Sequence, residues 1–364
     1  MRALQTPDDF IAAGLLAPAY GPVAARVAGD FRLLLSPAMG GAIHAPDDPV
    51  ARQFVPSAAE LLPDPAGRPD PIGDGAHRVA PGLTHRYPDR AILQVTQTCA
   101  VYCRFCFRRE AVGDTGALPP RDLQAALDHL ARTPAIREVI LTGGDPLTLS
   151  PRRLAAIRAA LAAMPHVELM RIHSRIPVVA PERITAPLLD ALCGPGPTVW
   201  LVIHTNHAQE LTAPARAAIA RLADRGIPLL SQSVLLRGVN DRADALEDLF
   251  RALLKLRVKP YYLHHCDLAR GAGHFRTGIA AGQGLMAELR RRLSGTGLPA
   301  FVLDIPGGYG KVPVAAPHVV PGDGPGLWRV TDREGRVHAY ADPDRGQGAS
   351  GAISSTSSPP RIAV

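Results

Sequence analysis

The sequence predicts an α/β protein built on a partial (β/α)6 barrel, with an N-terminal helical extension and a short C-terminal extension. From residue 91 onward, short apolar runs alternate with longer segments of helical periodicity. Such alternation implies right-handed βαβ crossovers and a parallel sheet, and six units fall short of the eight in a closed barrel. In a sheet of this kind, ligands bind beyond the C-terminal ends of the strands.

The expected strands and helices alternate regularly along the central part of the chain. The strands are expected at Ala91–Val95, Glu138–Leu141, Val167–Ile172, Thr198–His204, Pro228–Val234 and Pro260–His264. Helical stretches between them include Arg121–Ala131, Pro151–Ala163, Ala213–Arg225 and Ala243–Leu256.

The chain is expected to fall into four parts. Residues 1–90 hold a helical region, with short amphipathic pieces at Asp8–Leu16 and Ala58–Leu62, and then a connection rich in Pro, Gly and Asp. Residues 91–298 form the partial barrel, and residues 299–343 form a C-terminal segment. Residues 344–364 are rich in Gly, Ser and Pro, which predicts a disordered tail.

Composition and charge narrow the class of protein. The formal charge is +7, but Lys is scarce, Arg is scattered and aromatic residues make up only 5%, so no basic stripe for nucleic acid is evident. No secretory signal and no apolar run of about 20 residues is found, which predicts a cytoplasmic protein without a membrane partner. Five cysteines, three of them within eight positions, favour a metal site in a reducing compartment over a disulfide framework.

Cys99, Cys103 and Cys106 directly follow the first expected strand, in TCAVYCRFCFRR. Thiolates are ligands for iron–sulfur clusters and for zinc, and a closed zinc site needs four protein ligands. Three thiolates on a 4Fe–4S cluster leave one iron open, which the amino and carboxylate groups of S-adenosylmethionine can occupy. The spacing therefore predicts a radical S-adenosylmethionine enzyme. The alternatives are a zinc site completed by a distant residue and a chance grouping.

A Gly-rich turn follows the second expected strand, in Leu141-Thr142-Gly143-Gly144-Asp145-Pro146. Two glycines allow a ligand to approach the backbone closely. Asp145 could then accept a hydrogen bond from the ammonium of bound S-adenosylmethionine. The alternative is an ordinary turn.

A second Gly-rich loop, PGGYGK, ends at Lys311 and follows the strand-like run Ala300–Leu303. A lysine in such a loop can form a Schiff base with pyridoxal phosphate, although a surface lysine is the simpler interpretation. The Walker spacing of a phosphate loop is absent. Before the first strand, Arg86 and Arg90 could grip a phosphate dianion, or be ordinary surface arginines.

With these residues, the chain resembles the lysine 2,3-aminomutase family of radical S-adenosylmethionine enzymes, from about residue 50 to about residue 320. The resemblance rests on several motifs in one order: PGLTHRYPDRAIL, the three cysteines, TGGDPL, RIHSRIPVVAPERIT, LLRGVND, YYLHHCDLARGAGHFRT and DIPGGYGKVPV. It implies a partial barrel of the radical SAM type. The segment IHSRIPVV is similar to the subgroup that makes β-lysine for elongation factor P.

The resemblance also implies cofactor sites. The three cysteines would hold the 4Fe–4S cluster, and Lys311 would carry pyridoxal 5′-phosphate. Arg86 and Arg90 would serve the cofactor phosphate. His204 and Gln232, at the fourth and fifth strand ends, would contact S-adenosylmethionine. Because no cysteine follows Cys266, the extra zinc-binding cysteines of some family members are missing, and no structural zinc is expected.

For the substrate, the resemblance implies a cationic amino acid. Arg108 would bind the α-carboxylate, and Asp267 and Asp304 would bind the ε-ammonium of lysine. A buried carboxylate is costly unless paired, so two of them beside an active-site loop suit a cationic side chain. The implied reaction is the interconversion of L-lysine and β-lysine, with an electron donor such as flavodoxin or ferredoxin, and a homo-oligomer is allowed.

Several functions stay open at this point. The chain could be a radical enzyme without pyridoxal phosphate, or a family member that acts on arginine or another cationic amino acid. It could also be a zinc- or cluster-bearing binding module for a translation factor or RNA. The motifs do not separate these uses, and they leave open the pathway and the stereochemistry at the β-carbon.

Overall fold

The structure is a computed structural model that describes residues 2–113, 115–324 and 326–341. The chain divides into two compact units, of which the first ends at Ala315 and the second begins at Ala316. The expected boundaries at residues 90 and 298 do not coincide with a division between units. The expected tail, residues 344–364, lies outside the described residues.

The first unit is organised around one sheet in which ten strands follow each other in chain order, β1 to β10. From β3 to β9 all neighbours pair in parallel, while β1, β2 and β10 pair antiparallel at the two sides. The strands are β1 (Arg78–Ala80), β2 (Leu83–Tyr87), β3 (Arg90–Thr96), β4 (Glu138–Gly143), β5 (Leu169–Ser174), β6 (Thr198–His204), β7 (Leu229–Leu235), β8 (Lys259–His265), β9 (Ala300–Asp304) and β10 (Lys311–Pro313). The expected partial barrel is therefore confirmed, with β9 as one more parallel strand.

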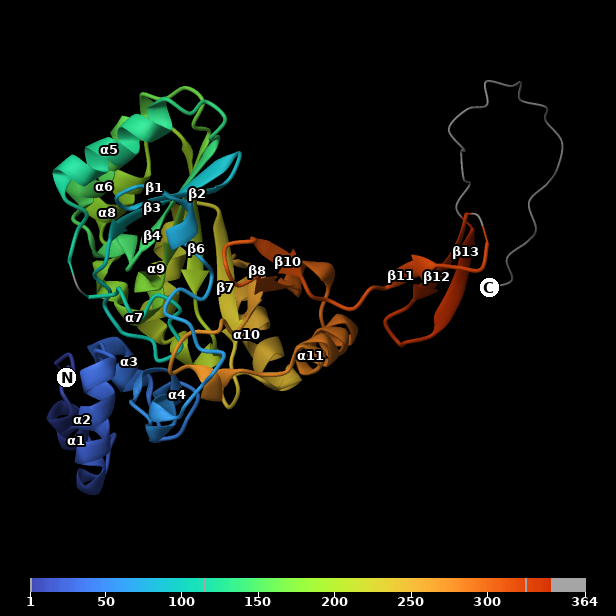
Figure 1. The fold of residues 1–364 in the computed structure, drawn as a ribbon, viewed down its shortest axis with the longest axis horizontal. Coiled ribbons are helices and arrows are strands. Elements are labelled where there is room, and N and C mark those ends of the chain that lie inside the picture. The colour runs from blue at the N-terminus through green and yellow to red at the C-terminus, as the bar shows by residue number, and fades with distance from the viewer. Residues whose placement is uncertain (1, 114, 325, 342–364) are drawn as a thin grey trace. The chain divides into compact units, whose positions relative to one another are not determined.

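Helices follow the parallel strands and pack along the outside of the curved sheet (Figure 1). They are α5 (Pro120–Ala131), α6 (Pro151–Ala162), α7 (Ile176–Val179), α8 (Ala186–Leu192), α9 (Ala213–Asp224), α10 (Ala243–Lys255) and α11 (Ile279–Arg292). Several begin where the sequence supplies a cap: the Ser150 hydroxyl accepts from the Arg153 N–H before α6, and the Thr212 hydroxyl accepts from the Ala215 N–H before α9. Pro at the first or second helical position adds to these start signals.

The N-terminal region is helical, as expected, and packs into the same hydrophobic core as the sheet. Its helices are α1 (Pro7–Ala12), α2 (Gly21–Asp30), α3 (Pro37–Ala42) and α4 (Ala51–Phe54), and the expected piece at Ala58–Leu62 is a short 3-10 turn, Ala58–Leu61. Phe10 and Phe54 are fully buried in the core cluster that also contains Leu93 and Leu141 of the sheet. These shared core contacts pack the N-terminal extension against the barrel.

Residues 78–87 were expected to be part of the connection, and here the expectation is wrong, because they form β1 and β2. Strand β2 pairs with β3 as a hairpin whose turn is Pro88-Asp89. Pro and Asp are turn-forming residues between two short runs, so this hairpin could have been recognised from the sequence.

The second unit, in its described residues, contains a separate antiparallel sheet of β11 (Val319–Pro321), β12 (Leu327–Thr331) and β13 (Val337–Ala341). Several of its apolar side chains are exposed: Val319, Leu327, Val337 and Tyr340.

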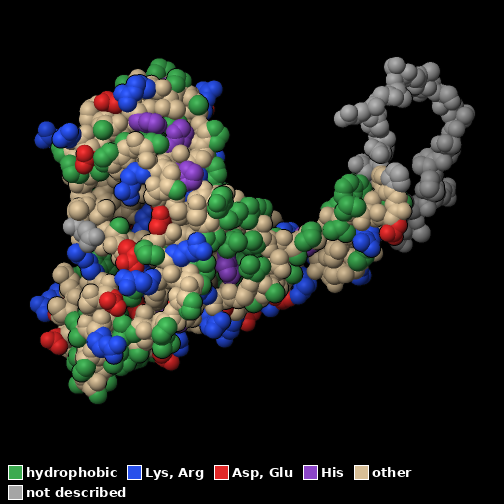
Figure 2. Space-filling model, in the orientation of Figure 1, with side chains coloured by type: hydrophobic (Ala, Val, Ile, Leu, Met, Phe, Trp, Pro, Cys, Tyr) green, Lys and Arg blue, Asp and Glu red, His purple; other side chains and the backbone are tan. Residues whose placement is uncertain are grey.

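Two surface properties bear on partners. Lys and Arg side chains are interspersed with Asp and Glu over the face of the first unit that Figure 2 shows. Among the described residues, no helix is both long and apolar enough to span a bilayer.

Candidate active site

The three clustered cysteines lie on the loop that follows β3 and line one recess. Their thiols interact: burial and then the charges of neighbouring groups, including Cys106 and Cys103, raise the pKa of Cys99 well above its usual value. Burial also raises the pKa of Cys106 to about 11. The loop has therefore brought the three sulfur atoms together in surroundings that favour neutral thiols until a metal is bound, because a coordinating cation deprotonates its thiol.

Cys103 is held by a buried arginine from the strand end two strands away. Arg175, directly after β5, donates from Nη1 to the Cys103 sulfur at 2.7 Å. Its Nη2 donates to Gln53 Oε1 at 2.6 Å and to Glu210 Oε2 at 2.7 Å. Because Arg175 and Glu210 are almost fully buried, this contact is shielded from water. A hydrogen bond to a ligating sulfur is a recognised influence on an iron–sulfur cluster.

A second buried ion network fixes the cysteine loop from the other side. Glu60 accepts from Arg104 Nε at 3.0 Å and Nη2 at 2.5 Å, and from Arg109 Nη2 at 2.5 Å. The Glu60 and Arg104 side chains are 0% and 2% exposed. Burial opposes the charge on Glu60, but the two arginines hold its pKa below the usual value. The N-terminal region thus anchors the segment that carries the cysteines.

Gly143 and Gly144 pack against the start of the cysteine loop. A Cβ at Gly143, where φ is +120°, would lie 2.2 Å from the Thr96 carbonyl oxygen, and one at Gly144 would lie 2.3 Å from the Thr98 oxygen. The space beside each glycine is filled by protein backbone, so these glycines let β4 approach the loop that carries Cys99. The expected approach of a ligand to this backbone stays a prediction.

Asp145 accepts hydrogen bonds from groups of the protein itself. Its Oδ1 accepts from the Leu147 N–H at 3.0 Å and from the Ser174 hydroxyl at 2.7 Å. Its Oδ2 accepts from the N–H groups of Arg175 at 2.6 Å and Ile176 at 3.1 Å. The side chain is buried, and burial raises its pKa although these bonds lower it. Through these four hydrogen bonds Asp145 joins the ends of β4 and β5, and the expected bond to the ammonium of S-adenosylmethionine stays a prediction.

His204 and Gln232 are register partners on adjacent strands β6 and β7. The His204 ring lies edge-on to Phe105 of the cysteine loop, with ring centres 5.7 Å apart. Its Nε2 is buried and has no hydrogen-bond partner in the described part of the chain. The two residues expected to contact S-adenosylmethionine therefore lie side by side, and His204 borders the cysteine loop.

Lys311 begins β10 and pairs in register with Asp304, the last residue of β9. Its ammonium forms an ion pair with Asp304 and lies 3.2 Å from His264 Nδ1 and 5.6 Å from the centre of the Tyr262 ring. Its backbone N–H donates to the Tyr87 hydroxyl at 2.9 Å. The lysine is therefore not a free surface residue, and its side chain is only 22% exposed.

The two aspartates expected at the substrate site have opposite electrostatic states. Asp304 is buried, which would raise its pKa, but the hydrogen bond with His264 and the charge of Lys311 lower it to about 2. Burial, followed by repulsion from Asp304, raises the pKa of Asp267 to about 7, while Lys311 and Arg108 act in the other direction. Four expected site residues, from separate parts of the chain, thus influence one another.

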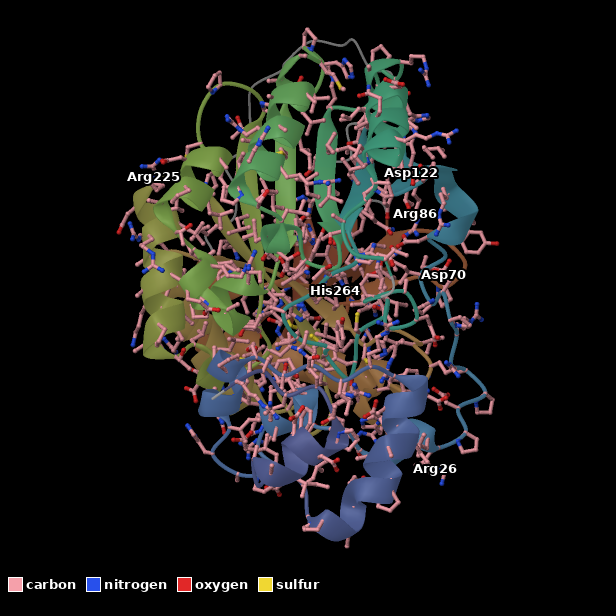
Figure 3. All side chains as sticks on the ribbon, turned by 90° about the vertical axis from the view of Figure 1, so that its left-hand side faces the viewer. Arg26, Asp70, Arg86, Asp122, Arg225 and His264 are labelled. Carbon is pink, nitrogen blue, oxygen red and sulfur yellow. The ribbon has the colours of Figure 1, made fainter. Side chains whose placement is uncertain are left out.

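Arg86 and Arg108 meet at one carboxylate, whereas Arg90 is directed elsewhere. Asp74 Oδ2 accepts from Arg108 Nη2 at 2.8 Å, and Asp74 Oδ1 accepts from Arg86 Nη2 at 3.1 Å. Arg90 pairs with Asp89 at 2.8 Å and lies 3.9 Å above the Tyr87 ring. In Figure 3, Arg86 lies on one flank of the unit and His264 nearer its centre. The two arginines expected to hold one phosphate thus have different partners in the structure, and their shared role stays a prediction.

The residues present fit the expected cofactors. Three interacting thiols line one recess, which suits an iron–sulfur cluster. Among the described residues, no group of three His, Cys, Asp or Glu side chains could hold a single metal ion. A half-buried lysine amine beside the Tyr262 ring suits pyridoxal, and the buried Arg86 Nε, without a partner in the described structure, suits an anionic group.

Sequence reasoning missed several site residues. Tyr87, Tyr262 and His264 surround Lys311, and Asp74 holds two arginines. His264 could have been found, because it is the second-last residue of a parallel strand, where ligands bind. Asp74 carries no such signal, since it is one of several aspartates in an irregular connection.

The chain is similar to a protein-family profile and to individual known enzymes. The profile of the Radical SAM superfamily matches residues 93–252. L-lysine 2,3-aminomutase from Clostridium subterminale is 45% identical over 276 residues, which cover 76% of this chain and 66% of that protein, so the chain spans about two thirds of its length. The enzyme of the same name from Acetoanaerobium sticklandii is 43% identical, covering 83% of this chain and 73% of that protein.

A relative with another name is also similar. Glutamate 2,3-aminomutase from Clostridioides difficile is 36% identical over 298 residues, which cover 81% of this chain and 70% of that protein. Similarity across the family therefore does not select the amino acid. The chain belongs to the lysine 2,3-aminomutase family of the Radical SAM superfamily.

Proposed function

We propose that this protein interconverts L-lysine and β-lysine, with a 4Fe–4S cluster on Cys99, Cys103 and Cys106 and with pyridoxal phosphate on Lys311. One observation carries the proposal: the Lys311 ammonium pairs with the Asp304 carboxylate, and the charges of both act on the pKa of the buried Asp267. Together with Arg108 these are the groups that a cationic amino acid and its cofactor need, and they come from three segments: the cysteine loop, the end of β8 and the β9–β10 hairpin. The proposal extends to a cytoplasmic location, a flavodoxin- or ferredoxin-type electron donor and the absence of structural zinc.

The cofactors supply the radical and carbonyl chemistry, and the protein supplies position and charge. S-adenosylmethionine and the reduced cluster supply the radical that removes a hydrogen atom, and pyridoxal phosphate supplies the carbonyl group that takes up the migrating nitrogen. Lys311 provides the amine that anchors pyridoxal. Arg108 binds the α-carboxylate, and the buried walls exclude water.

The preference for a cationic side chain follows from the contacts of Lys311 itself. Its ammonium pairs with Asp304 and lies beside His264. An alkylammonium group is therefore already accommodated by Asp304 when no ligand is present. Once pyridoxal occupies the Lys311 amine, the ε-ammonium of substrate lysine would take that place and approach Asp267.

The same carboxylates argue against the glutamate specificity of the Clostridioides difficile relative. A substrate carboxylate would add a negative charge beside ionised Asp304 in a partly desolvated site, and would oppose ionisation of Asp267. Arginine, as another cationic amino acid, is the second candidate, and the two carboxylates favour it for the same reason. A substrate panel separates lysine from arginine.

The deciding experiment is anaerobic reconstitution with iron, sulfide, pyridoxal phosphate and S-adenosylmethionine, followed by reduction with dithionite in the presence of L-lysine. The expected result is β-lysine, resolved by chiral chromatography. Borohydride should fix pyridoxal on wild-type protein and not on Lys311→Ala, and Cys103→Ala should lose cluster iron. Cleavage of S-adenosylmethionine without any β-amino acid product would refute the aminomutase assignment.

Substrate recognition has its own test. Asp304→Ala should weaken the binding of L-lysine far more than the binding of L-norleucine, which has the same carbon skeleton without the ε-amine. Equal loss for both amino acids would remove the recognition argument and leave Asp304 as a partner of Lys311 alone.

A further inference from the structure

Asp74 lies between two arginines that the proposed function assigns to different anions. Its side chain is 11% exposed, and it belongs to the irregular segment before β1. One carboxylate oxygen accepts from Arg108 Nε at 3.1 Å and Nη2 at 2.8 Å, and the other accepts from Arg86 Nη2 at 3.1 Å. Each oxygen of Asp74 therefore serves one guanidinium group.

The contact with Asp74 determines which edge of Arg108 is left for a ligand. A guanidinium group carries five N–H donors in a rigid planar fork. Asp74 occupies the Nε–Nη2 edge, while Nη1 makes only a 3.3 Å contact with the Thr142 hydroxyl. The edge formed by Nη1 and Nη2 is thus the one left for a ligand carboxylate.

Arg86 is fixed in a comparable way. Its Nη2 donates to the Ile72 carbonyl oxygen at 2.8 Å as well as to Asp74, and its side chain is 8% exposed. Its Nε is buried without a hydrogen-bond partner in the described residues. A buried donor without a partner is costly, so this nitrogen is a candidate for contact with a bound anion.

The segment that carries Asp74 is itself anchored at both ends. The Asp70 carboxylate accepts the N–H groups of Asp74 at 3.0 Å and Gly75 at 2.8 Å. Three residues after Asp74, His77 Nε2 lies 2.9 Å from the Gly308 carbonyl oxygen, in the loop that leads to Lys311. Residues 70–77 therefore contact the cysteine loop, strand β2 and the lysine loop at once.

We propose that Asp74 is a positioning residue that couples the two anion sites, the cofactor phosphate at Arg86 and the substrate carboxylate at Arg108. The inference rests on the proposed function. Without Asp74, two guanidinium groups that share one carboxylate would repel each other in partly desolvated surroundings and would turn away from their ligands. Loss of this one carboxylate therefore disturbs both sites, although it contacts neither ligand.

The test compares Asp74→Asn with single-site variants. Affinity for pyridoxal phosphate is measured by absorbance titration, and affinity for L-lysine by calorimetry on pyridoxal-loaded protein. Asp74→Asn should weaken both by about ten-fold or more, since lost orienting partners of bound groups typically cost 10–100-fold. Arg86→Lys should weaken mainly pyridoxal phosphate, and Arg108→Lys mainly L-lysine.

Two further variants separate positioning from folding. Asp64→Asn is the matched control, because Asp64 lies in the same connection as Asp74, is similarly buried and also pairs with an arginine, Arg276. It should leave both affinities unchanged. Asp74→Glu keeps the charge and should restore a substantial part of both affinities, which also keeps the test valid if Asp74→Asn does not fold.

The outcomes are distinct. The coupling would be overturned if Asp74→Asn weakened only one of the two affinities or neither. It would also be overturned if Asp64→Asn weakened both affinities as much as Asp74→Asn does. Stronger binding of either anion in Asp74→Asn would show that Asp74 competes with ligands, and would also overturn it. If wild-type protein binds no pyridoxal phosphate at all, the proposed function fails instead.

Discussion

The two sides of the candidate active site are held together by different kinds of ion pair. On the cysteine side, Glu60 and Arg104 are almost fully excluded from water and contact only other protein groups. On the lysine side, Lys311 pairs with Asp304 while its side chain remains 22% exposed. The first arrangement can persist when cofactors bind, whereas the second uses groups that the proposed ligands must themselves contact.

The difference separates scaffold from binding groups. A buried pair that loses one partner leaves an uncompensated charge, so the cysteine loop depends on Glu60 for its stability. At the ligand site, one partner of an ion pair can instead be replaced by a ligand group of the same charge. The substrate ammonium can replace the Lys311 ammonium beside Asp304. The contrast predicts large stability effects on the cysteine side and pH-dependent effects on the lysine side.

The largest effect is expected for Glu60→Gln. Removing the carboxylate leaves Arg104 and Arg109 buried without their counter-charge, which should cost about 3–5 kcal/mol of unfolding free energy. Denaturant unfolding of cofactor-free protein at pH 7 measures it. A loss below about 1 kcal/mol would show that the network does not anchor the loop.

Asp267→Asn should have the next largest effect, with the opposite sign. The wild-type carboxyl has its pKa raised to about 7, so the folded state holds its proton while the unfolded state releases it near pH 4. Stability of the wild type therefore falls as pH rises from about 4 to about 7. The variant should be more stable than wild type above pH 7, by an amount on the order of a few kcal/mol, and equally stable below pH 4.

Asp304→Asn is the matched control for that experiment. The pKa of Asp304 is lowered to about 2 in the folded protein. Its ionised form therefore stabilises the fold at pH values above the pKa of an aspartate in the unfolded chain, and this contribution is lost as pH falls toward 2. The variant should therefore be less stable than wild type at pH 7. Two Asp→Asn changes with the same sign at pH 7 would contradict the assigned electrostatic states.

Spacing along the chain was enough to predict the barrel and the cysteine loop. The cysteines are close in sequence, and each parallel strand carries its own apolar pattern, so local information suffices. The glycine-rich loop after a strand made Lys311 a candidate in a similar way, but its assignment to pyridoxal came from the family resemblance. Arg108 and the two aspartates came from the family resemblance.

The partners of these residues could not be predicted in the same way. Asp74 meets Arg108 across 34 positions of sequence, and no local pattern distinguishes it from Asp64 or Asp70. The donors to Asp145 were equally hidden, because three of the four come from the end of β5 and the residues just after it. Contacts between distant segments depend on how the strands are arranged in space.

A smaller effect is expected for Lys311→Met in cofactor-free protein. Asp304 would lose a cation that lowers its pKa, which should cost about 1–2 kcal/mol at pH 7 and progressively less as pH falls below 4. Lys259→Met is the control, because the Lys259 ammonium donates to carbonyl oxygens such as those of Pro260 and Leu298. The loss of unfolding free energy in Lys259→Met should not change between pH 4 and pH 2. If the loss changed with pH in the same way in both variants, Asp304 would not be its cause.

The smallest effect is expected for Glu168→Gln, which breaks an ion pair of the same residue types as Glu60 and Arg104 but at the surface. Glu168 and Arg137 are 2.8 Å apart, with side chains 58% and 59% exposed. Water and salt screen such a pair, so the change in unfolding free energy should stay within about 0.5 kcal/mol. It should become smaller still in roughly 0.5 M salt. The cost of Glu60→Gln should be nearly independent of salt, because its charges are buried. If both variants responded to salt alike, burial would not be what distinguishes the cysteine side from the rest of the molecule.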